Sequence, residues 1–126
     1  MSDDTGIEPR MRLAGLADLP PAESVPADVL QQDAALLGRL LAGAARNAGT
    51  GDRGVSDDDV AAALSLFEDM RMALDQLETQ VVIEARRRGM EWRQIASHQG
   101  MRSSQAASQR YQRLVTRLEE IRQGIR

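Results

Sequence analysis

Polar side chains that can read DNA bases are concentrated between residues 102 and 109, in the order Arg-Ser-Ser-Gln-Ala-Ala-Ser-Gln. An arginine fork fits the edge of guanine, a glutamine amide fits adenine, and a serine hydroxyl can bond to several base edges. These side chain types, close together in one segment, predict sequence-specific contact with DNA. The candidate base-reading residues are Arg102, Ser103, Ser104, Gln105, Ser108 and Gln109.

Arginines lie on both sides of this segment, and all 16 basic residues of the chain are arginines. The planar guanidinium donates two parallel hydrogen bonds to a phosphate, although codon bias in a GC-rich genome would also explain the lack of lysine. Three consecutive arginines at a helix end exceed what the helix dipole needs, which leaves charge for phosphates. The candidate phosphate contacts are Arg86, Arg87, Arg88, Arg93, Arg110 and Arg113.

The distribution of charge along the chain supports this location. Residues 1–80 carry 15 acidic residues against six arginines, whereas residues 81–126 carry ten arginines against four glutamates. The net charge of −3 over 126 residues therefore conceals an acidic part followed by a basic part. Only the second part is expected to meet a polyanion such as DNA.

Two helices separated by a tight turn must position the polar segment. The pattern predicts a short helix over 91–99 and a longer one over 103–123. The expected features are a small residue where the helices cross, a glycine with positive φ, an apolar plug, a serine cap and a small inward residue. In order along the chain, these positions are filled by Ala96, Gly100, Met101, Ser103 or Ser104, and Ala106.

On these residues the segment resembles the helix-turn-helix of small actinobacterial DNA-binding proteins, and that of the sigma-factor region that reads the −35 promoter element. The matching residues are Gly89, Trp92, Ile95, Ala96, Gly100, Met101, Ser103, Ala106, Ala107, Arg110 and Tyr111. Gln99 departs from the pattern, because leucine is usual there. The resemblance implies DNA binding through the second helix, with Trp92 more suited to plugging the core than to stacking on a base.

The first 88 residues predict helices without a recognisable motif. Residues 1–25 are rich in proline and acid, and we expect a disordered tail there. A helical packing or dimerisation region is expected over 26–88, with a first helix from about Pro26, and the DNA-binding region over 74–126. Ser56 is expected to cap a long helix over 57–88 that ends at Gly89. This helix carries an apolar seam at heptad spacing: Val60, Ala63, Phe67, Met70, Leu74, Leu77 and Val81.

The expected fold is therefore all-α, with a long helix, a C-terminal helix-turn-helix and a disordered acidic tail. The expected function is DNA binding in transcriptional regulation or in the nucleoid, by a cytoplasmic homodimer. The alternative is a protein-interaction module that binds a partner helix of the transcription machinery. No cysteine and a single histidine argue against a metal site, and no catalytic motif is present. We expect no enzyme activity, cofactor, small-molecule substrate or membrane span.

Overall fold

The computed structural model describes residues 7–16, 25–47 and 54–124, and within these ranges it contains five helices and no strand. The helices are α1 (Ile7–Ala14), α2 (Val25–Asn47), α3 (Asp57–Arg87), α4 (Trp92–Gln99) and α5 (Ser104–Arg122). The all-α class predicted from the sequence is confirmed. None of these helices combines the length and the apolar character that crossing a membrane requires.

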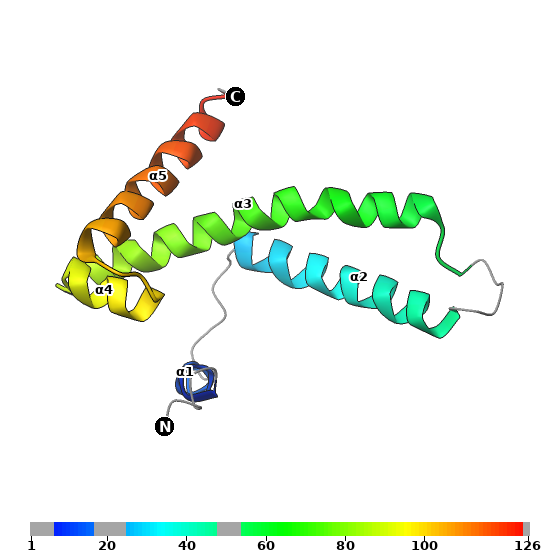
Figure 1. Ribbon diagram of the computed structural model, residues 1–126, viewed down its shortest axis with the longest axis horizontal. Coiled ribbons are helices and arrows are strands. Elements are labelled where there is room, and N and C mark those ends of the chain that lie inside the picture. The colour runs from blue at the N-terminus through cyan, green and yellow to red at the C-terminus, as the bar shows by residue number, and fades with distance from the viewer. Residues whose placement is uncertain (1–6, 17–24, 48–53, 125–126) are drawn as a thin grey trace.

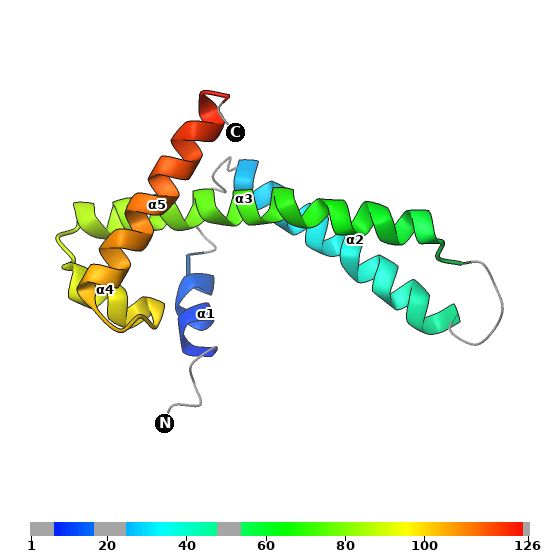
Figure 2. The ribbon, with the colours of Figure 1, turned by 45° about the horizontal axis from the view of Figure 1, so that its top comes forward.

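The long helix α3 organises the molecule (Figure 1). α2 runs antiparallel along its first half, and α4 and α5 pack at its other end. Figure 2 shows the same arrangement in a second view, in which α1 stands apart from the α2–α3 pair. The α2–α3 pair and the C-terminal helices therefore share α3 as a common support.

Both ends of α3 follow from local sequence. The Ser56 hydroxyl accepts a hydrogen bond from the Asp59 amide at 3.2 Å, and the Ser56 amide donates back to the Asp59 carboxylate at 3.1 Å. Three aspartates in the first turn also favour the positive end of the helix dipole. Gly89, at φ +85°, leads the chain out of the helix. The predicted span of 57–88 is confirmed to within one residue, and the helix is unbroken.

The first helix corrects the sequence prediction. Disorder was expected throughout residues 1–25, but Ile7–Ala14 form α1. Residues 1–6 and 17–24 lie outside the described part. Proline and acid content lowers the chance of a packed core, but it does not prevent an eight-residue helix. Pro9 lies in the first turn of α1, where its missing amide costs no bond. α2 begins at Val25, as predicted from Pro26.

The main cluster of buried residues lies at the α4–α5 end of α3, while Ala73 near the middle of α3 and Leu114 of α5 are buried outside it. Val82 from α3, Ile95 and Ala96 from α4, and Ala107 from α5 form one cluster. Around it pack five half-buried or partly buried side chains: Ala85, Met90, Trp92, Met101 and Tyr111. This cluster fixes α4 and α5 relative to α3. The polar face of α5 lies on the side of the helix away from the cluster.

Candidate nucleic-acid interface

The connection between α4 and α5 is a tight turn over residues 100–103. Gly100 adopts φ +73°, and the Met101 amide donates to the Ala96 carbonyl at 2.8 Å. The Ser103 hydroxyl then caps α5 by accepting from the Ala106 amide at 3.1 Å. The roles predicted for Gly100 and for a serine cap are confirmed, because each depends on interactions over only a few residues.

The end of α3 repeats this design. Gly89 has positive φ, and the Met90 amide donates to the Ala85 carbonyl at 3.0 Å. Met90 and Met101, each directly after its glycine, both pack against the buried cluster. A glycine that turns the chain, followed by an apolar residue that anchors it, is the Schellman ending of a helix. The two turns thus hold α4 between α3 and α5.

The inward face of α5 falls one residue later than predicted. Ala107 is 2% exposed and belongs to the core cluster, whereas Ala106 is only half-buried. Leu114, seven residues after Ala107, is also buried. Two alanines stand side by side in the sequence, and only the rotation of α5 against α3 and α4 selects between them. The small inward residue of α5, which the sequence placed at Ala106, is therefore Ala107.

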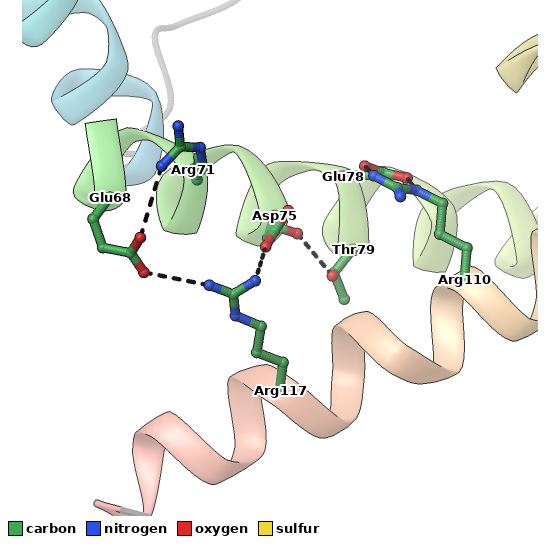
Figure 3. Close-up of polar contacts among 7 residues, drawn as sticks. All are labelled: Glu68, Arg71, Asp75, Glu78, Thr79, Arg110 and Arg117. Carbon is green, nitrogen blue, oxygen red and sulfur yellow. Dashed lines mark hydrogen bonds and ion pairs between the residues drawn. The ribbon is translucent and has the colours of Figure 1, made fainter. Parts of the chain in front are cut away.

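Glu78 of α3 connects all three helices of this region. Its carboxylate accepts from the Arg110 guanidinium at 2.5 Å and 2.7 Å, and from the Gln99 amide nitrogen at 3.0 Å. Figure 3 shows the Glu78–Arg110 pair between α3 and α5. The hydrogen bonds that Arg110 donates to Glu78 raise the pKa of Arg110 above its ordinary value. Gln99, at the position where the sequence pattern led us to expect leucine, thereby gains a partner for its amide nitrogen, although its buried Oε1 accepts no hydrogen bond from the described residues.

A second polar connection lies further along α5. Arg117 approaches Glu68 at 3.4 Å and Asp75 at 3.7 Å (Figure 3). Thr79, buried between these two connections, donates its hydroxyl to the Asp75 carbonyl at 2.8 Å. The acidic side of α3 thus binds the basic side of α5. Part of the arginine surplus of the C-terminal region serves this internal contact.

The six candidate base-reading residues do not form a single exposed set. Ser103 is the cap of α5 and Ser108 is half-buried. The other four are exposed, and their side chains form no hydrogen bond or ion pair with the described part of the chain: Arg102, Ser104, Gln105 and Gln109. Gln112, exposed one turn after Gln109, continues the same face and was missed from the sequence. Its spacing of seven residues from Gln105 was the available signal.

The six candidate phosphate contacts divide according to their internal partners. Arg110 is bound to Glu78, so the phosphate role predicted for it has no support in this geometry. Arg86 donates to the Met90 carbonyl at 2.8 Å and lies 4.9 Å from the centre of the Trp92 ring. Trp92 in turn packs beside Tyr111, with 5.7 Å between ring centres. Arg86 therefore reinforces the corner between α3 and α4.

The remaining four arginines are more accessible. Arg87 and Arg88 both contact Glu84, whose pKa their hydrogen bonds lower, Arg88 contributing most. They share one carboxylate between two exposed guanidinium groups, so a positive charge is left over. Arg93 has only a 3.8 Å contact with Glu91, both side chains being well exposed. Arg113 is exposed and has no ion pair within the described residues.

Comparisons of this chain with protein-family models, with curated proteins and with solved structures find no match. The described residues also contain no group of three or more histidine, aspartate or glutamate side chains placed to hold a metal ion. The geometry of α4, α5 and the end of α3 is therefore what indicates the function of this chain.

Proposed function

We propose that this chain binds double-stranded DNA through α4 and α5, acting as a helix-turn-helix in which the first turns of α5 enter the major groove. The observation that carries the proposal is the two-sided character of α5. Ala107 and Leu114 anchor one side in the core, while Gln105, Gln109 and Gln112 line the opposite side without internal partners among the described residues. Amide side chains on a rigid helix are suited to base edges.

The positions of the accessible arginines favour DNA binding at the same surface. Arg102 lies at the turn before α5, Arg93 on α4 and Arg113 on the exposed side of α5. Phosphate contacts from Arg93 and Arg113 would set the position and orientation of α5 on the duplex, while Arg102 and the glutamines supply sequence information. Arg87 and Arg88 are a weaker phosphate pair, because they share Glu84. The proposed biological role is transcriptional regulation or organisation of the nucleoid.

The test begins by selecting the preferred duplex from a random pool, followed by titrations at matched salt. Gln105→Ala or Gln109→Ala should weaken binding to the preferred duplex by roughly 1–3 kcal/mol, and binding to other duplexes very little. Arg113→Ala should weaken all duplexes nearly equally and reduce the salt slope by about one unit, because a phosphate contact carries no sequence information.

Matched control variants are available on α2. Gln32→Ala and Arg39→Ala on α2 remove the same side chain types from exposed positions away from the proposed interface. Both controls should bind as the parent chain does. The proposal fails if no duplex binds at low salt, or if folded Gln105 and Gln109 variants bind the preferred duplex with unchanged affinity.

A protein-interaction role is the second candidate, and one observation favours it. An apolar groove of about 680 Å³ lies between α3 and α4, lined by side chains that include Leu77, Val81, Met90 and Met101. A partner helix would fit such a groove through apolar contacts. Salt separates the two candidates, because DNA binding weakens steeply with salt whereas an apolar interface does not.

A further inference from the structure

An uncovered apolar strip runs along α3. Its members are Val60, Leu64, Phe67, Leu74 and Val81, which are 45%, 66%, 39%, 55% and 67% exposed. Val60, Phe67, Leu74 and Val81 recur every seven residues, which is the repeat of a coiled-coil seam. From residue 60 to residue 81 the strip is about 32 Å long at 1.5 Å per residue.

Because all five side chains are at least 39% exposed, the contacts that α3 makes within the chain leave the strip open, and its Leu74 and Val81 form part of the groove beside α4. The other members of the predicted seam that lie between them, Ala63, Met70 and Leu77, are half-buried. Leu37 and Leu40 of α2 line the cleft beside Ala63, and Leu77 lines the groove beside α4. Toward α4 and α5, the buried residues of α3 are Thr79 and Val82. The heptad seam predicted from the sequence is thus divided. Every second member faces the chain's own helices, and the others are exposed to solvent.

We propose that a second copy of this chain covers the strip, with its α3 antiparallel to the first. The proposal is independent of DNA binding. Reversing the helix maps the exposed members of the seam onto themselves: about a point between Met70 and Arg71, Val60 exchanges with Val81, and Phe67 with Leu74. A two-fold interface requires this self-complementarity, because the same surface must serve both partners. An unrelated partner would impose no such symmetry.

Charge favours the antiparallel orientation. α3 begins with three aspartates at 57–59 and ends with arginines at 86–88. Antiparallel packing brings the acidic start of each helix toward the basic end of the other, and it opposes their dipoles. Parallel packing would place acid beside acid and base beside base. In the antiparallel pair Arg71 lies near the two-fold axis, within a turn of the second copy's Glu68.

The dimer is tested by sedimentation equilibrium of the full chain at micromolar concentrations. The parent chain should be a dimer, and the double variant Leu64→Glu, Leu74→Glu should raise the dimer dissociation constant at least tenfold. Both leucines are more than half exposed in one chain, so the charge does not disturb the core of the monomer. Ile83→Glu is the matched control, because Ile83 is 43% exposed on α3 but lies outside the strip.

The orientation is tested by disulfide formation, since the parent chain has no cysteine. Arg71→Cys should cross-link to itself, and Val60→Cys should cross-link only when mixed with Val81→Cys. Self-linking of Val60→Cys would show a parallel pair and overturn the proposed orientation. A monomeric parent chain, or a strip variant that dimerises as tightly as the parent, would overturn the dimer itself. DNA binding by a monomeric strip variant would leave the proposed function standing, so the two failures are distinguishable.

Discussion

The two ends of α3 differ in how completely one chain can bury them. At the C-terminal end, Val82, Ile95, Ala96 and Ala107 are between 2% and 4% exposed. Among the described residues before Ala73, by contrast, none is buried, although α2 follows α3 over much of this length. The first region closes a small core within the chain, and the second leaves its apolar side chains half covered.

The difference has a geometric cause. Three helices that cross at angles can enclose a cluster, and two glycine turns bring α4 and α5 back onto α3. Two antiparallel helices share only one line of contact, so each keeps an open side. The C-terminal region thus closes a core of its own, while the α2–α3 pair keeps an exposed apolar side, which we propose a second copy covers.

The largest expected effect comes from placing a charge in the closed region. Ala107→Glu should lower the free energy of unfolding by at least about 3 kcal/mol, because a buried polar group without a partner costs roughly 2–7 kcal/mol. Thermal unfolding followed by circular dichroism measures this loss, and DNA binding should disappear with the fold. Ala61→Glu, at an exposed position in the α2–α3 pair, is the control and should change stability by less than about 0.5 kcal/mol. Equal losses at both sites would remove the contrast between the regions.

A smaller effect is expected from the polar connection that joins α3, α4 and α5. Glu78→Ala leaves Arg110 and Gln99 without their shared carboxylate, and should cost about 1–3 kcal/mol. Because the two side chains of the ion pair are 39% and 21% exposed, solvent keeps the loss below that of a fully buried pair. Urea unfolding measures it.

Glu84→Ala is the matched control for this connection, since Glu84 also binds two partners but on the surface of a single helix. A clearly smaller loss is expected there, because solvent screens an exposed ion pair. If both glutamates contributed equally, Glu78 would have no special role in closing the region.

The smallest effect compares two helix caps of nearly equal geometry. Ser56 and Ser103 accept from amides at 3.2 Å and 3.1 Å, and replacing either by alanine should cost about 1 kcal/mol in its own region. Hydrogen exchange should increase in α2 and the first half of α3 for Ser56→Ala, and in α4 and α5 for Ser103→Ala. Exchange that increases equally throughout the chain in both variants would show that the two regions unfold as one unit.

The structure confirms some of the sequence predictions and contradicts others. The caps and the glycine turns were predicted correctly, because they involve residues at most five apart. The cap at Ser56, the glycine at position 89 and the apolar seam between them also predicted α3 as a single helix. The prediction of a disordered tail over residues 1–25 was wrong where α1 forms, because composition reports a lack of core-forming residues and does not exclude a short helix.

The candidate site was predicted less completely than the elements that carry it. Six arginines near the motif looked equivalent, yet Arg110 binds a glutamate 32 residues away and Arg86 stacks on Trp92. Ser103 is the α5 cap, as one of the sequence predictions had it, and Gln112 extends the exposed face. Each of these assignments depends on which helix lies opposite.

By itself, then, the sequence determined where most helices begin and end and which segment carries the exposed polar groups. Those features arise from hydrogen bonds and side chain periodicity within a few residues, and they survive any change in helix packing. The tertiary structure alone decided that Ala107 and not Ala106 enters the core, that Arg110 is paired while Arg113 is accessible, and that Val60 and Phe67 remain uncovered while Ala63 faces α2. These choices follow from the rotation of whole helices against one another, which is set by contacts between residues far apart in the chain.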